Sequence, residues 1–265
     1  MQPFVSPGRH GAARVSSRDG LTLIELVAVL AILSAVAGLV SSFFPGLMQR
    51  SSSAVAGASS MDLIRALERH RIRSGRFPDG YDSLIEAPYT LYSAIPTAAR
   101  RQLKPKDLDN ADRVVLSSYG ITTAWMHAAP DGQAVTWQSL SNTKALDVNA
   151  GGFAADDVAA LDTSRIDPDV LFGEGTRRGT MNESFVVLGI GDRCSLVGAD
   201  RELSRAPITP GASATLDPRD YYMRYAFVFR LDRDDRRPLQ FLGTVAFAES
   251  GIVTGNDLMR QWWKK

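Results

Sequence analysis

The sequence predicts an α+β fold, in which a long N-terminal helix precedes a mostly antiparallel β-sheet domain with an enlarged insert. An apolar segment starts at Leu21, and three stretches rich in β-branched and aromatic residues lie in the C-terminal third. With 265 residues, 45% of them hydrophobic, the chain can bury a real core. Its net charge of +1 gives no electrostatic reason to expect a nucleic-acid partner. Cys194 is the only cysteine, which excludes an intrachain disulfide.

Residues 21–44 form the apolar segment, and Glu25 is its one charged side chain. As a helix the segment would reach roughly 36 Å, compared with about 30 Å for the hydrocarbon core of a bilayer. Three arginines precede it, Arg9, Arg14 and Arg18. The positive-inside rule therefore predicts a single transmembrane helix over 21–44, with residues 1–20 in the cytoplasm and the bulk of the chain across the membrane.

Glu25 decides between the interpretations of this segment. A secretory signal peptide could be cut after Ala37, but a carboxylate inside its apolar core argues against it. A plain signal anchor fits the length, yet it gives Glu25 no purpose at a cost of about 2.5–3.5 kcal/mol. A glutamate that snorkels to the interface from near the helix end is a further alternative.

The stretch from Gly20 to Leu26, GLTLIEL, resembles the prepilin signature of type IV pilins and type II secretion pseudopilins. The resemblance implies that a prepilin peptidase/methyltransferase removes residues 1–20 as a leader, cuts between Gly20 and Leu21, and methylates Leu21. It also implies that Thr22 and Glu25 serve assembly, with Glu25 meeting the N-terminal ammonium of a neighbouring subunit. Two departures are Leu21, where phenylalanine is usual, and Asp19, where a basic residue commonly stands.

Beyond the apolar segment, the pattern predicts that one helix continues over 21–75. Pro45 is expected to kink it rather than end it, because a helical pattern resumes afterwards. The small residues of 51–60 suit close helix packing, although a flexible linker is an alternative. Gly75 and Pro78 predict the helix end, with glycine as a left-handed cap and proline just beyond it.

The resemblance also implies that the apolar helix lies in the inner membrane and that residues 76–265 form a periplasmic globular domain of the pilin-like kind. The stretch 75–85, GRFPDGYDSLI, is similar to the segment that follows the long helix in major pseudopilins. Strands are predicted at 184–191, 221–232 and 239–248, with a polar hairpin loop at 233–238, and weaker strands at 114–116 and 134–137. Residues 90–180 are mixed in character and are interpreted as an enlarged insert.

No catalytic constellation is found in the sequence, so no enzyme activity is expected. The histidines at 10, 70 and 127 lie too far apart for a zinc motif. Gly189 and Gly191 are an isolated pair of glycines that lacks the rest of a phosphate-binding pattern. Residues 107–112, DLDNAD, begin like a calcium loop but lack its glycine and its final glutamate. Acids between 156 and 169 form a second cluster. No cofactor is predicted, and a loop calcium is left as an alternative.

These observations predict a structural subunit, a minor or specialised pseudopilin of a type II secretion pseudopilus, that assembles into a filament and helps export proteins. The expected partners are the prepilin peptidase/methyltransferase, other pilin-like subunits, an inner-membrane assembly platform and membrane lipid. The alternatives are a minor pilin of a type IV pilus, for adhesion or DNA uptake, and a signal-anchored periplasmic binding module or enzyme. Trp262 and Trp263 could touch a partner, although docking on the sheet is the plainer interpretation.

Overall fold

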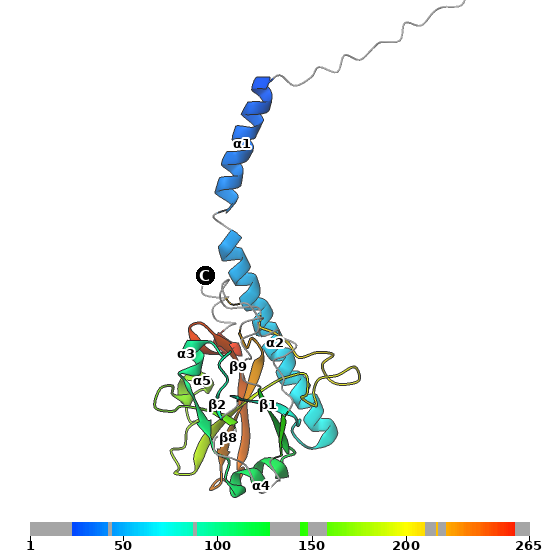
Figure 1. The fold of residues 1–265 in the computed structure, drawn as a ribbon, viewed down its shortest axis with the longest axis vertical. Coiled ribbons are helices and arrows are strands. Elements are labelled where there is room, and N and C mark those ends of the chain that lie inside the picture. The colour runs from blue at the N-terminus through cyan, green and yellow to red at the C-terminus, as the bar shows by residue number, and fades with distance from the viewer. Residues whose placement is uncertain are drawn as a thin grey trace, which may run out of the picture. The chain divides into compact units, whose positions relative to one another are not determined.

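A computed structural model of the chain describes residues 23–41, 44–86, 89–127, 144–147, 158–209, 216 and 221–257 (Figure 1). The chain divides into two compact units, Met1–Pro45 and Gly46–Lys265. The first contains helix α1, Leu23–Ser41, and the second contains the sheet and nearly all of helix α2, Phe44–Ser74.

The prediction of one long pilin-like helix over 21–75 is wrong, because the structure has two separate helices, α1 and α2, in that range. Pro45 gives a physical reason for the division. It is the second residue of α2, and a proline is well tolerated in the first turn of a helix, where its missing N–H is not needed. In the interior of a continuous helix the same residue would remove a hydrogen bond and clash with the preceding turn.

The prediction of a single-pass inner-membrane protein with a periplasmic C-terminal domain is also corrected. Across the described part of the chain, none of the helices combines the length and the apolar character that crossing a bilayer requires.

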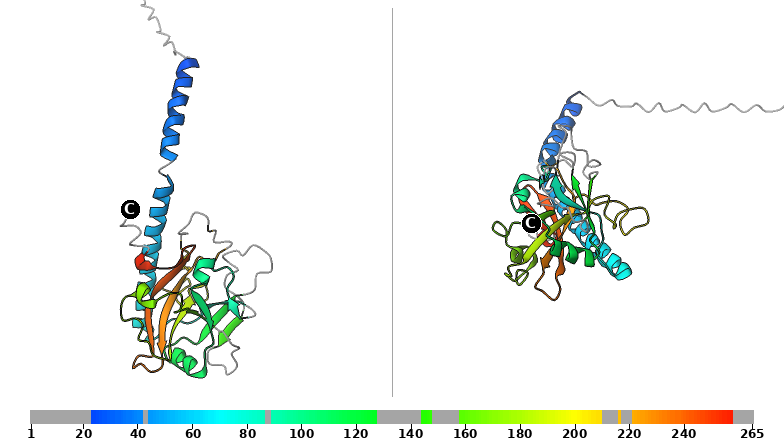
Figure 2. Two further views of the ribbon diagram at one scale, coloured as in Figure 1. Left: turned by 90° about the vertical axis from the view of Figure 1, so that its left-hand side faces the viewer. Right: turned by 60° about the horizontal axis from the view of Figure 1, so that its bottom comes forward.

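Helix α2 packs on the sheet through a face of small and aliphatic residues, which include Ala56, Ser60, Leu63 and Leu67. All four are buried, and the Tyr225 hydroxyl donates a hydrogen bond of 2.8 Å to the Ala56 carbonyl oxygen. Figure 2 shows α2 running along the sheet. The predicted helix end is confirmed: α2 stops at Ser74, and Gly75 has a φ of 71° and donates its N–H to the Arg71 carbonyl oxygen at 2.8 Å.

The sheet has ten strands in the described residues, with a main order of β10-β9-β8-β7-β1-β4-β5. All its described pairings are antiparallel except β1–β4, which is parallel. The strands are β1 Tyr81–Glu86, β2 Thr90–Leu91, β3 Leu103–Lys106, β4 Thr123–His127, β5 Lys144–Asp147, β6 Val158–Leu161, β7 Glu183–Gly189, β8 Tyr225–Asp232, β9 Leu239–Ala248 and β10 Gly251–Thr254. Strand β2 pairs with β1, and β6 pairs with both β3 and β7. Strands β7, β8 and β9 occupy the three stretches predicted as strands.

The described strands of residues 90–180 are part of this sheet rather than an insert added to it, which corrects the expectation of an enlarged insert. Strand β4 pairs with β1 and β6 pairs with β7, so the region supplies inner positions of the sheet. It also carries three short helices, α3 Thr97–Arg100, α4 Asn110–Ser118 and α5 Pro168–Phe172.

Helix α4 corrects the weak strand prediction at 114–116. The Asp109 carboxylate accepts a hydrogen bond of 2.9 Å from the Asp112 backbone N–H, which makes Asp109 the N-cap of the helix. The acidic run that begins like a calcium loop is therefore a helix start, in which Asp112 also pairs with Lys106 at 2.8 Å. The other weak strand, 134–137, lies outside the described residues.

Hydrophobic cores lie on both faces of the sheet, and β8 contributes to both because successive strand residues point to opposite faces. Phe227 and Phe229 join the core that includes α2, with ring centroids 6.3 Å apart at 89°. Ala226 and Val228 join the core on the other face. Every residue of β8 is buried.

Candidate functional site

The residues predicted for processing and assembly belong to the start of the chain. Gly20, Leu21 and Thr22 lie outside the described residues. Glu25 is exposed in the first turn of α1, where the partial positive charge of a helix N-terminus favours a carboxylate. Pro45, predicted as a kink, lies in the first turn of α2.

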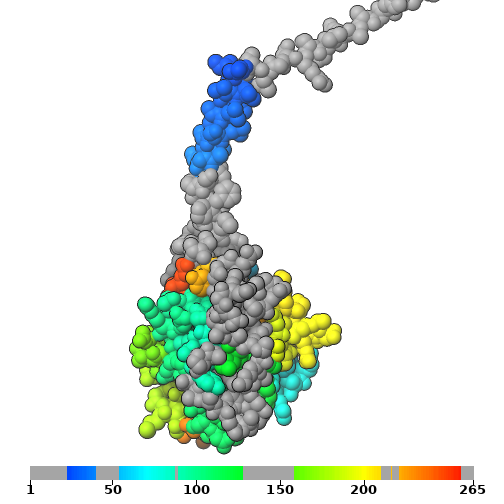
Figure 3. All heavy atoms as spheres, in the orientation of Figure 1, coloured from blue at the N-terminus to red at the C-terminus, as the bar shows by residue number. Residues whose placement is uncertain are grey.

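Helix α1 presents apolar side chains around its whole circumference. Every residue from 23 to 39 is exposed within the chain, and Figure 3 draws the helix as blue spheres. The large exposed hydrophobic residues are Leu23, Ile24, Leu26, Val27, Val29, Leu30, Ile32, Leu33, Val36 and Leu39. Burying one such side chain fully is worth about 1.5–3 kcal/mol, and helices that are apolar on all sides are normally covered. This surface is therefore suited to association with other apolar helices.

A second group of polar residues lies inside the sheet domain, around Asp82 of β1. Asp82 is fully buried, and its Oδ2 accepts a hydrogen bond of 2.9 Å from the Tyr222 hydroxyl. Burial raises the pKa of Asp82 to about 7, although nearby Arg224 and the Tyr222 hydrogen bond act in the opposite direction. Arg224 is itself buried and forms a 2.7 Å ion pair with Asp192.

Aromatic rings enclose this group on the side of β4. His127, the last residue of β4, is buried and stacks on Tyr92 with ring centroids 4.1 Å apart. Its ring also meets Tyr222 edge-on at 5.5 Å. Tyr222 is fully buried, and this burial raises the pKa of its hydroxyl well above the ordinary value.

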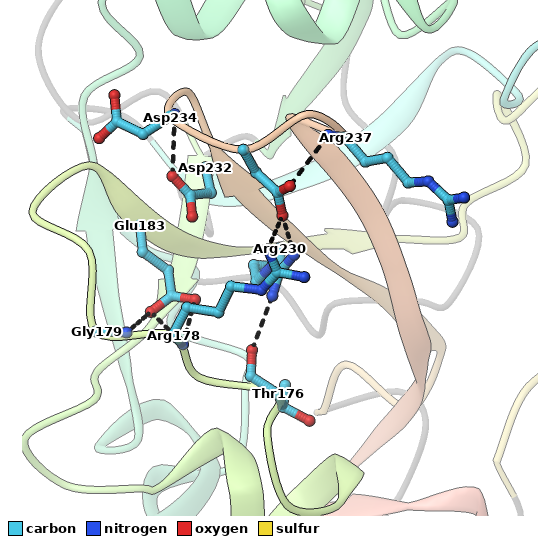
Figure 4. Close-up of polar contacts among 9 residues, drawn as sticks. Thr176, Arg178, Gly179, Glu183, Arg230, Asp232, Asp234 and Arg237 are labelled. Carbon is cyan, nitrogen blue, oxygen red and sulfur yellow. Dashed lines mark hydrogen bonds and ion pairs between the residues drawn. The ribbon is translucent and has the colours of Figure 1, made fainter.

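A third polar group fixes the hairpin between β8 and β9 to the loop before β7 (Figure 4). The buried Arg230 donates to the Asp235 carboxylate at 2.6 Å and to the Thr176 carbonyl oxygen at 3.3 Å. Arg178 reaches the same Asp235 oxygen at 2.8 Å. The Glu183 carboxylate accepts the backbone N–H groups of Arg178 and Gly179. Because each of these side chains has a partner within the protein, we interpret this group as structural.

Three acids of the cluster between 156 and 169 also have local structural partners. Asp162 accepts hydrogen bonds from Ser164, Asp167 is the N-cap of α5, and Asp169 accepts the Arg177 backbone N–H at 2.8 Å. Asp156 and Asp157 lie outside the described residues. Within the described ranges, no three histidine, cysteine or acidic side chains come together as metal ligands would.

Cys194 is a buried free thiol of the core that faces α2, and burial raises its pKa to about 12. Reactive cysteines have lowered pKa values, so a packing role is the consistent interpretation. Trp262 and Trp263 lie outside the described residues.

The sequence pattern did not reveal the buried polar groups around Asp82 and Arg230. One signal was present: the predicted strand 221–232 contains two arginines, Arg224 and Arg230, among apolar and aromatic residues. A charge in such a strand indicates a buried ion pair. Its partners, Asp192 and Asp235, could not be read from the pattern.

Compared with family models, with curated proteins and with solved structures, the chain shows no significant match to any of them.

Proposed function

We propose that this chain is a structural subunit of a filament, of the kind formed by type II secretion pseudopilins, and that α1 is its assembly surface. One observation carries the proposal: α1 is apolar and exposed on all sides, and its one charged residue is Glu25, five positions after Gly20. The proposed role is association rather than catalysis.

The chemistry of assembly follows from the position of Glu25. Cleavage between Gly20 and Leu21 leaves an ammonium group at Leu21, and N-methylation keeps its positive charge. When α1 helices of neighbouring subunits pack together, their apolar side chains leave water, and a carboxylate buried among them requires a cation. The ammonium of the next subunit supplies that cation, so the pair would fix the axial register of the subunits.

The partners implied by this proposal are a prepilin peptidase/methyltransferase, other pilin-like subunits and the assembly platform of a secretion machine. A minor pilin of a type IV pilus would use the same α1 surface and the same processing. The single cysteine favours secretion over an adhesive pilus tip, since such tips often carry disulfides.

The experiment is to express the full chain with and without a prepilin peptidase and to determine its intact mass and N-terminal sequence. The expected product begins at a methylated Leu21. Gly20→Val should remain uncut, whereas Gly11→Val, at a leader glycine outside the signature, should be cut normally. An uncut wild-type chain, or a product cut after Ala37, would exclude the proposal.

A further inference from the structure

The sheet has a narrow joint between two groups of strands. Strands β2, β4 and β5 are connected to the rest through β1. In the described residues, β1 pairs with β7 through one residue pair, Asp82 with Gly189, whereas β7 pairs with β8 along its whole length. We call the position formed by Asp82, Gly189, Gly191 and Tyr222 the sheet joint.

The carboxyl group of Asp82 fills the sheet joint tightly. A Cβ atom added to Gly191 would lie 2.3 Å from Asp82 Oδ1, and one added to Gly189 would lie 2.1 Å from the Tyr222 hydroxyl oxygen. Both glycines are therefore required for this close approach. Among the described residues, Asp82 Oδ1 has no hydrogen-bond partner, so a negative charge on it is poorly compensated.

Several titratable and charged groups face Asp82 from the elements packed against it. Tyr222 is its hydrogen-bond donor, and Arg224 is the cation that most favours its charged form. Arg224 is shared with Asp192, which opposes ionisation of Asp82. The remaining groups are Arg193 and Cys194 after β7, Tyr92 after β2, and His127 at the end of β4, whose ring meets that of Tyr222.

The backbone beside the joint is irregular. The register of β1 with β4 shifts between Asp82 and Glu86, and Leu84 has a φ of 62°, which is unusual for a leucine in a strand. Leu84 is fully buried, so surrounding packing holds this conformation in place. Strained backbone of this kind persists only where the surrounding structure fixes it, and it is common in segments that switch between conformations.

We propose that Asp82 makes the sheet joint sensitive to pH: the neutral carboxyl group keeps β1 closed on β7, and the carboxylate loosens β1 together with β4. The ordinary pKa of the group, 3.8, applies to the opened state, and about 7 applies to the closed one. The closed state therefore binds the proton more tightly. The stabilisation of the closed state by the protonated Asp82 carboxyl group is fully present below pH 3.8. It falls as the pH rises towards 7 and does not change further above that.

The test is hydrogen exchange of the full-length chain at pH 5.5 and pH 8, read by mass spectrometry and corrected for intrinsic exchange rates. The opening constant of peptides from β1 and β4 should rise roughly 30-fold between these values, as the two pKa values imply. The opening constant of β8 and β9 peptides should change much less, because their pairing does not pass through the joint.

Asp82→Asn keeps the shape of the side chain and cannot ionise, so its β1 and β4 peptides should show the same opening constant at both pH values. Asp62→Asn, which alters an exposed acid on α2, should keep the wild-type response. The proposal is overturned if the wild-type opening constant is independent of pH. It is equally overturned if Asp82→Asn keeps the full response, since the titrating group would then be another one, such as His127.

Tyr222→Phe provides a second variant in case Asp82→Asn does not fold. It removes the one hydrogen bond to the carboxylate, so the midpoint of the pH response should move to higher pH. An unchanged midpoint in this variant contradicts the proposal.

Discussion

Helix α1 and strand β8 are both rich in apolar residues, yet the strand is buried and the helix is exposed. Every residue of β8 is buried, Arg230 among them, and so is Arg224 just before the strand. By contrast, every residue of α1 from 23 to 39 is exposed. The domain can bury two arginines because each has an acidic partner, Asp192 or Asp235. The difference teaches that the apolar residues of β8 serve folding, while those of α1 are available for association.

The largest expected difference in the free energy of unfolding is between alanine substitutions at Phe227 and at Leu30. Phe227→Ala should lower the free energy of unfolding of the domain by about 3–5 kcal/mol, because the ring is fully buried and contacts Phe229, Tyr81 and Phe241. Leu30→Ala should change it by less than ~0.5 kcal/mol, since Leu30 is 54% exposed. Urea unfolding followed by tryptophan fluorescence measures both. Equal losses in the two variants would show that α1 belongs to the folded core.

A smaller difference is expected between two glycines. Gly191→Ala should cost about 1–3 kcal/mol, because the added methyl group meets the buried Asp82 carboxyl at 2.3–2.6 Å. A Cβ on Gly38 in α1 meets nothing within 4 Å, so Gly38→Ala should leave domain unfolding unchanged and favour the helix by about 0.5–1 kcal/mol. Thermal unfolding reports the first effect and helical circular dichroism the second. A Gly191→Ala domain as stable as the wild type would contradict the close contact between Gly191 and the Asp82 carboxyl group.

The smallest effect concerns the cap of α4. Asp109→Ala should lower the free energy of unfolding by about 1 kcal/mol. Asp109→Asn should lower it much less, because asparagine also caps helices. The hydrogen bond from the Asp112 backbone N–H lowers the pKa of Asp109, so the cap's charge contribution is present above ~3.9 and is lost as the pH falls below that. Urea unfolding at pH 7 and pH 3 gives the comparison. An Asn variant as unstable as the Ala variant would contradict the capping role.

The parts of the fold that depend on local pattern were predictable from the sequence. Strands β7, β8 and β9 follow their β-branched and aromatic runs, and Gly75 ends α2 as expected. The β-branched residues in the run Val114 to Leu116 favour a strand, but the run is helical because the N-cap at Asp109 starts a helix there. The helical pattern that spans Pro45 concealed the division between α1 and α2.

Several of the buried polar contacts join residues far apart in the chain, and this is why the sequence did not reveal them. Asp82 and Tyr222 are 140 positions apart, and Ser60 and Thr244 are 184 apart. A single sequence contains no signal that pairs such positions. For the candidate assembly surface the reverse holds: the features that define it, Gly20, Glu25 and the apolar run, are contiguous, so the sequence displays all of them.

The measurement that tests the central claim most directly is electron microscopy of filaments formed by the processed chain in cells that carry the secretion machine. We expect filaments from the wild-type chain. We expect none from Glu25→Ala, although this variant should still be cleaved after Gly20. Glu68→Ala, which removes an exposed acid of α2, should assemble normally. Normal filaments from Glu25→Ala would contradict the claim that Glu25 of α1 sets the register of assembly.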